Sequence, residues 1–142
     1  MPLSASHSPL LSQFSILVVD DDPDIRMTLA DLFGELGHEV FAVGTGTEAV
    51  DQVTHHHFDA VLLDVGLPDI DGLTVLRTLT DLKPRLPVVI LTAYTSLGKR
   101  GGILDIPGAY ASLAKPYKIQ ELTAAVGRAL CYSGPASGKK GA

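Results

Sequence analysis

Apolar residues in this chain fall into two alternating kinds of segment. Short, nearly continuous apolar runs predict strands, and they cover residues 16–19, 40–43, 60–63, 88–91 and, with a weaker pattern, 110–113. Longer segments with apolar residues at helical spacing lie between most of them. Strands separated by helices must run parallel, because the chain has to cross over before the next strand begins. The pattern therefore predicts an open α/β sheet with helices on both faces.

The predicted helices have recognisable ends. Gly37 is placed to stop the first helix. The spacing of Thr45 and Glu48 suits a capping box at the start of the second helix, and Asp71 is expected to cap the third. The last helix is expected over about residues 119–130.

The stretch between residues 92 and 115, where a fourth helix would lie, is rich in helix breakers. These are Gly98, Gly101, Gly102 and Pro107. Each interior glycine costs a helix roughly 1 kcal/mol relative to alanine. We therefore expect the fourth helix to be short or irregular.

Composition narrows the class of protein. The chain has 142 residues, of which 46% are hydrophobic and 19% charged, as expected for one globular domain over residues 14–132. Residues 1–13 and 133–142 read as flexible flanks. No apolar run has membrane-spanning length and no secretory signal is recognised, so we expect a cytoplasmic protein that does not enter a membrane.

Cysteine count and charge exclude further classes. Cys131 is the single cysteine, so neither an internal disulfide nor a Cys-rich zinc site can form. The net charge is −5 and there is no run of Lys or Arg, which argues against direct nucleic-acid binding.

Polar residues follow four of the predicted strands. They are Asp20 with Asp21, then Asp64, Thr92 and Lys115. The carboxyl ends of parallel strands share one edge of the sheet, where ligands bind. Three carboxylates drawn together repel one another unless a cation neutralises them, and oxygen ligands of this kind suit Mg²⁺.

Such a cleft can hold a phosphoryl group. Once a metal masks the charge, a carboxylate can act as a nucleophile and form an acyl phosphate. The Lys115 ammonium and the Thr92 hydroxyl can then stabilise the phosphoryl oxygens.

The motifs at these strand ends resemble those of the response-regulator receiver family of two-component signalling. They read ILVVDDDP at residues 16–23, VLLDVGLP at 61–68 followed by Asp71-Gly72, then Thr92-Ala93 and Lys115-Pro116. The resemblance covers roughly residues 15–130. It implies a flavodoxin-like, doubly wound, five-stranded parallel sheet in the order 2-1-3-4-5 with five helices, and a cis bond between Lys115 and Pro116.

The resemblance also implies a function and a set of site residues. Asp64 would accept a phosphoryl group from a histidine kinase or a histidine phosphotransfer protein. Mg²⁺ would be bound directly by Asp21, Asp64 and the Gly66 carbonyl, and through water by Asp20. The chain would be a signalling domain rather than an enzyme, acting through phosphorylation-dependent contacts with a downstream protein, with homodimer formation left open.

One switch position departs from the family pattern. Receivers carry Tyr or Phe three residues before the lysine, where this chain has Ser112. Tyr110 lies two residues earlier and points to the same face of an extended strand. Thr92, Ser112 and Tyr110 are therefore the candidate switch residues.

Two other functions compete. A receiver-fold binding module that no longer responds to phosphorylation would explain Ser112 and the glycine-rich segment. Asp20 and Asp22, spaced by one residue after a strand, also resemble the haloacid-dehalogenase phosphatases, but Asp64 would then be unexplained.

Two features are expected to have no functional role. Asp69 is read as a solvated loop residue, and the His55–His57 run is read as a favourable helix end rather than a metal site.

Overall fold

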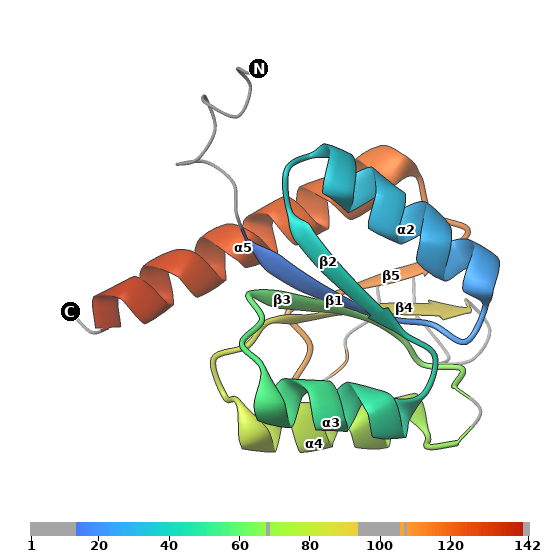
Figure 1. Ribbon diagram of the computed structural model, residues 1–142, viewed down its shortest axis with the longest axis horizontal. Helices are drawn as coiled ribbons and strands as arrows, with labels where there is room; N and C mark the ends of the chain where they lie inside the picture. The colour runs from blue at the N-terminus through green and yellow to red at the C-terminus, as the bar shows by residue number, and fades with distance from the viewer. Residues whose placement is uncertain (1–13, 68, 94–105, 107, 141–142) are drawn as a thin grey trace.

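The protein forms one five-stranded parallel sheet with the strand order β2-β1-β3-β4-β5, as predicted (Figure 1). The computed structural model describes residues 14–67, 69–93, 106 and 108–140. The strands are β1 (Ser15–Val19), β2 (Glu39–Val43), β3 (Ala60–Asp64), β4 (Val88–Ala93) and β5 (Ala111–Lys115). Every predicted strand is present, with its ends shifted by at most two residues.

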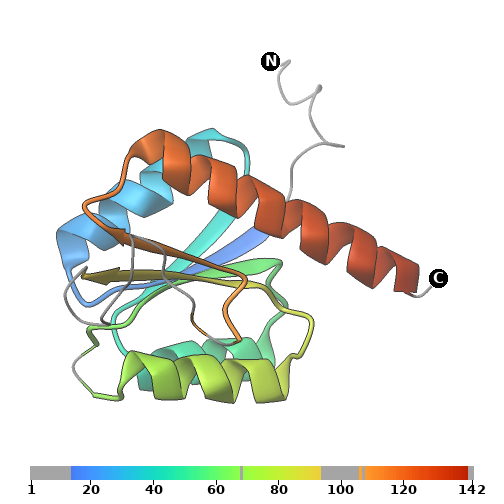
Figure 2. The ribbon, with the colours of Figure 1, turned by 180° about the vertical axis from the view of Figure 1, so that it is seen from behind.

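Helices cover both faces of the sheet, as Figures 1 and 2 show from opposite sides. Helices α2 (Pro23–Glu35) and α5 (Ile119–Lys140) lie on one face, and helices α3 (Gly46–His55) and α4 (Gly72–Leu82) lie on the other. The short or irregular helix expected between residues 92 and 115 falls on residues 94–105 and 107, which lie outside the described part of the chain. The helix α5 continues ten residues past the predicted end near residue 130 and so enters the segment that we read as a flexible flank.

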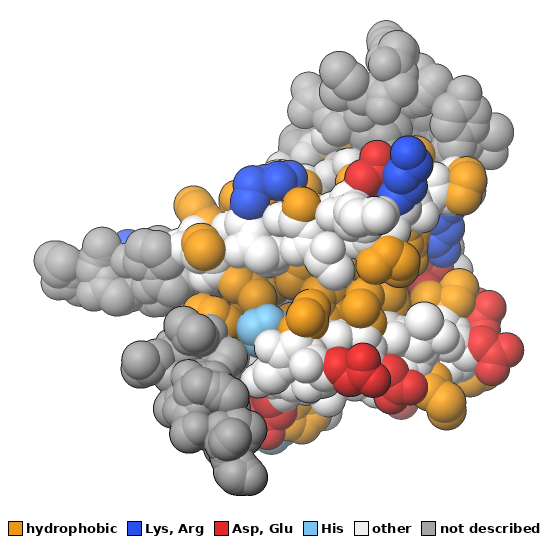
Figure 3. All heavy atoms as spheres, turned by 90° about the horizontal axis from the view of Figure 1, so that it is seen from above, with side chains coloured by type: hydrophobic (Ala, Val, Ile, Leu, Met, Phe, Trp, Pro, Cys, Tyr) orange, Lys and Arg blue, Asp and Glu red, His pale blue; other side chains and the backbone are white. Residues whose placement is uncertain are grey.

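The strand residues alternate between two cores. Ile16 and Val18 of β1 point to the core under α2 and α5, whereas Leu17 and Val19 point to the core under α3 and α4. All four are at most 1% exposed. Burying one such side chain contributes about 1.5–3 kcal/mol, so both faces of the sheet must be covered. Viewed from the side of α2 and α5, a band of hydrophobic side chains is visible between the two helices (Figure 3).

The helix ends lie at the capping residues that the sequence predicted. Thr45 caps α3 by accepting a hydrogen bond from the Glu48 N–H, and Asp71 caps α4 by accepting one from the Thr74 N–H. Gly37 has a φ of 98°, a left-handed conformation that a glycine adopts without steric cost.

Candidate phosphoacceptor site

The turn after β1 holds two acidic side chains at the sheet edge. Asp22 caps α2 by accepting from the Asp24 N–H, and Pro23 fixes the start of the helix, so Asp20 and Asp21 stay in the turn. Asp20 is 1% exposed and its Oδ1 accepts from the Asp22 N–H at 2.9 Å. These hydrogen bonds hold the turn between β1 and α2 in place.

Arg26 fixes the same turn from the first part of α2. Its Nη1 donates to the backbone carbonyl of Asp20 at 2.8 Å. The Asp20 N–H in turn donates to the carbonyl of Val43 at 3.1 Å. Sequence reasoning missed Arg26, although it lies only four residues after Asp22, where one helical turn brings a side chain back over the cap.

Strand register brings the other predicted residues to the same level. Asp64 ends β3 opposite Leu91, and Lys115 ends β5 opposite Ala93, so Thr92 lies between these two levels on β4. Thr92 is fully buried and Asp64 is 7% exposed. The Lys115 Nζ lies 3.4 Å from Asp64 Oδ1. The bond between Lys115 and Pro116 is cis, as expected.

The three predicted acidic residues converge. One carboxylate oxygen each from Asp20, Asp21 and Asp64 lies within 4.8 Å of the others. Gly66 lies beside them, and its N–H donates to Asp64 Oδ1 at 3.2 Å. Asp20, Asp21, Asp64, Gly66 and Lys115 therefore lie together at this edge of the sheet, with Thr92 placed on the neighbouring strand by its register.

The electrostatics of Asp20 indicate that the cluster suits a cation. Burial raises the pKa of Asp20, and the charge of Asp64 raises it further, against a lowering by the Asp22 N–H bond. Asp20 Oδ2 is buried and has no hydrogen-bond partner among the described residues. A buried oxygen without a partner beside two other carboxylates fits a hard divalent ion that takes oxygen ligands, such as Mg²⁺.

Asp69 is an exposed loop residue, as expected, and it also makes hydrogen bonds that the sequence did not predict. Its carboxylate accepts from the Gly46 N–H at 2.8 Å, the Thr47 N–H at 3.0 Å and the Thr47 hydroxyl at 2.6 Å. It therefore caps the start of α3 from the loop that follows Asp64. These bonds, the Thr47 hydroxyl first, lower the pKa of Asp69 to about 2.

Gly72 lets the end of the same loop fold back. A Cβ built there would lie 2.3 Å from Val65 Cα and 2.7 Å from the Val65 carbonyl oxygen. Because the clash is with backbone, no side-chain movement can relieve it. Only glycine allows α4 to begin against the residue that follows Asp64.

Two of the three switch candidates, Tyr110 and Ser112, lie at the edge of the sheet opposite β2. Ser112 is on β5 in register with Ile90 and is partly exposed. Tyr110 is 37% exposed, and its ring centroid lies 5.3 Å from that of Tyr132 on α5. Tyr110 thus has an aromatic neighbour, whereas Ser112 offers no ring.

The histidines at the end of α3 do not converge. His55 Nδ1 contacts Asp51, His57 Nε2 contacts Asp59, and the His56 ring stacks on Phe41. Within the described residues, the one group of acidic, histidine or cysteine side chains arranged to hold a metal is that of Asp20, Asp21 and Asp64.

Comparison with known proteins defines the class. The family profile of the response regulator receiver domain matches residues 16–127. The chain belongs to this family. It is a receiver domain of a two-component response regulator, and receiver domains are signalling domains rather than enzymes in the ordinary sense.

Individual relatives agree with this assignment. Over 123 residues the chain is 39% identical to the response regulator MprA of Mycobacterium sp. (strain KMS), a match covering 87% of this chain and 53% of that protein. The chain thus spans about half the length of this relative. It is also 36% identical over 111 residues to sporulation initiation phosphotransferase F of Bacillus subtilis, covering 78% of this chain and 89% of that protein.

Solved structures show the same fold. The response regulator TrrA of Thermotoga maritima, solved in complex with Mg(2+)-BeF, has a TM-score of 0.74 and 31% identity, covering 83% of this chain and all of that one. A CheY-like receiver domain protein from Methanospirillum hungatei has a TM-score of 0.76 at 26% identity, covering 86% of this chain and 97% of that one. In the part of the chain that the structure describes, no helix is both long and apolar enough to span a bilayer.

Proposed function

We propose that Asp64 accepts a phosphoryl group from a phosphohistidine of a histidine kinase or a phosphotransfer protein, with Mg²⁺ held beside it. The observation that carries the proposal is the convergence of Asp20, Asp21 and Asp64 within 4.8 Å, with Lys115 Nζ at 3.4 Å from Asp64. Membership of the receiver family and the Mg(2+)-BeF complex of TrrA support it.

Each residue has a separate part in the transfer. An Asp64 oxygen attacks phosphorus while the bond to the donor's histidine nitrogen breaks, leaving an acyl phosphate on Asp64. Lys115 and the Thr92 hydroxyl bind phosphoryl oxygens and stabilise their charge. Asp20, Asp21, Asp64 and the Gly66 carbonyl would hold Mg²⁺, which would supply positive charge beside the phosphoryl oxygens.

The signal would leave the domain through Thr92 and the outer face of β5. Thr92 moves toward the phosphoryl group, and Tyr110 reports that movement in place of the aromatic ring that Ser112 lacks. Tyr110 packs against Tyr132 of α5, and the state of this contact would show whether Tyr110 has moved. A downstream protein or a second copy of the chain would bind the changed surface. This binding would take place in the cytoplasm, and the chain would not contact nucleic acid directly.

Mapping the phosphorylated residue tests the proposal. The protein is incubated with Mg²⁺ and a small phosphodonor such as acetyl phosphate, and the acyl phosphate is trapped by reduction with borohydride and located by peptide mapping. Modification at Asp64 is expected. Modification at Asp20 would favour the phosphatase alternative, although Asp22, which that alternative needs beside Asp20, instead caps α2.

A second candidate is a receiver-fold module that binds its partner regardless of phosphorylation. The absence of a ring at Ser112 favours it. Nuclear magnetic resonance spectra of the protein with Mg²⁺ and beryllofluoride distinguish the two. Shifts at Tyr110 and Tyr132 are expected if the switch works, and shifts confined to the loops around Asp64 would support the unregulated module.

A further inference from the structure

Asp20 is held in place by hydrogen bonds from three parts of the chain. Its Oδ1 accepts from the Asp22 N–H at 2.9 Å, and its own N–H donates to the Val43 carbonyl at the end of β2. Its carbonyl accepts from Nη1 of Arg26 at 2.8 Å, and Arg26 belongs to α2. The Arg26 bond is the one that depends on the side chain of another residue, so a substitution can remove it.

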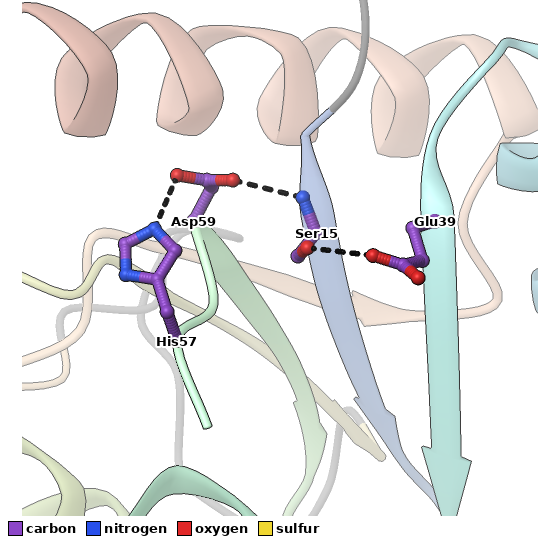
Figure 4. Close-up of polar contacts among 4 residues, drawn as sticks. All are labelled: Ser15, Glu39, His57 and Asp59. Carbon is purple, nitrogen blue, oxygen red and sulfur yellow. Dashed lines mark hydrogen bonds and ion pairs between the residues drawn. The ribbon is translucent and has the colours of Figure 1, made fainter.

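The other end of β1 has its own hydrogen bonds. The Ser15 N–H donates to Asp59 Oδ2 at 2.8 Å, and the Ser15 hydroxyl donates to Glu39 at 3.3 Å (Figure 4). Asp59 Oδ1 also contacts His57 Nε2 at 3.0 Å (Figure 4). The start of the strand is therefore anchored independently of Arg26, and loss of the Arg26 bond should loosen only the turn that follows β1.

Gly44 leaves room for the end of the Arg26 side chain. Gly44 directly follows β2, and a Cβ built there would lie 2.6 Å from Arg26 Nη1 and 3.4 Å from Arg26 Cζ. The next atom, the Asp20 carbonyl oxygen at 3.8 Å, is at an ordinary contact distance. A side chain at position 44 would therefore displace the guanidinium group, and with it the donor that binds Asp20, before it disturbed the backbone.

The backbone conformation at Gly44 does not itself require glycine. Its φ is not positive, so an alanine could adopt the same conformation. The Gly44 N–H donates to Glu48 Oε1 at 3.0 Å, which ties this position to the start of α3. The close approach of Arg26 is therefore the physical reason for a glycine here.

We propose that Arg26 and Gly44 form a positioning pair for the metal site. Arg26 fixes the turn that carries Asp20 and Asp21, and Gly44 keeps open the space that the Arg26 guanidinium occupies. Because Arg26 contacts the Asp20 backbone, it acts through the placement of these carboxylates and does not bind the ion. This pairing rests on the proposed function, since it assigns residues that orient the ligands of Mg²⁺.

Calorimetric titration of the full chain with Mg²⁺ tests the part played by Arg26. Arg26→Met keeps an apolar stem and removes the donor, and it should weaken Mg²⁺ binding about threefold to tenfold. This is less than the loss of about tenfold to hundredfold that is typical of groups bonded to the ligand atoms themselves. Arg26→Lys keeps a cationic N–H donor and should recover part of the affinity. Ser15→Ala, which removes a hydrogen bond at the other end of β1, should leave the affinity unchanged.

Gly44→Ala should weaken Mg²⁺ binding by about the same factor as Arg26→Met. Its urea midpoint should change little, because only the end of a flexible side chain has to move. Nuclear magnetic resonance spectra recorded with a chelator should show amide shifts at Asp20 and Asp21 in this variant. Gly34→Ala is the control, since a Cβ there meets no described atom within 4 Å, and it should bind Mg²⁺ as wild type does.

The double variant Arg26→Met/Gly44→Ala measures the coupling between the two residues. Met lacks the guanidinium atoms that a Cβ at position 44 would meet, so Gly44→Ala should add nothing to the effect of Arg26→Met. Additive losses of affinity would overturn the proposal, and so would Mg²⁺ binding by Arg26→Met that equals that of wild type. A wild-type protein that binds no Mg²⁺ would contradict the proposed function together with this inference.

Discussion

Asp69 ties the loop after β3 to Gly46, the first residue of α3, through a hydrogen bond of 2.8 Å. The residues are 23 positions apart, and two further bonds from Thr47 complete the cap. A negative charge here is favoured by the positive end of the α3 dipole. Because the same loop carries Gly66 beside the acidic cluster, Asp69 holds the position of a proposed metal ligand.

Removing this anchor is therefore expected to loosen the metal site. Asp69→Ala should weaken Mg²⁺ binding about threefold to tenfold, because groups that orient the ligands of a metal contribute to its affinity. Titration with Mg²⁺ followed by nuclear magnetic resonance or calorimetry measures this. Asp81→Ala, which removes an exposed acidic residue of α4, is the matched control and should leave the affinity unchanged.

The depressed pKa of Asp69 predicts a pH dependence of stability. A carboxyl whose pKa falls from 3.8 to about 2 on folding stabilises the folded state above pH 3.8, and this contribution is lost as pH falls toward 2. Wild type should therefore exceed Asp69→Asn in its urea midpoint at pH 6, and the difference should shrink between pH 4 and pH 2. A difference that stays constant over this range would contradict the assigned contacts.

Gly72 should tolerate no side chain. Gly72→Ala forces a Cβ against the Val65 backbone and is expected to lower the free energy of unfolding by about 1–3 kcal/mol. Gly127→Ala is the contrasting variant, because a Cβ there meets no described atom within 4 Å and α5 gains a better helix former. It should raise stability by about 0.5–1 kcal/mol in the same urea titration.

Asp20 should destabilise the protein when no divalent ion is present. Its buried carboxylate has an oxygen without a partner and lies beside two other acids. Asp20→Asn is therefore expected to raise the free energy of unfolding by about 1 kcal/mol in the presence of a chelator. Added Mg²⁺ should stabilise wild type more than the variant, and thermal unfolding with and without Mg²⁺ measures both effects.

Much of this architecture could be predicted from the sequence, because local signals agreed with the fold. The apolar runs marked every strand, and the residues that follow them marked the site, since a parallel sheet puts all its carboxyl ends at one edge. Asp69 could not be recognised because its partners, Gly46 and Thr47, lie on a different connection. The continuation of α5 to Lys140 was also missed, because Gly134 and Pro135 and the lack of an apolar period argue locally against a helix.

Asp64 is the group that we propose becomes phosphorylated. Intact-mass measurement of wild type and Asp64→Asn after incubation with acetyl phosphate and Mg²⁺ tests it most directly. One phosphoryl adduct is expected on wild type, lost when Mg²⁺ is chelated beforehand, and none on Asp64→Asn. An adduct of equal yield on the variant would contradict it.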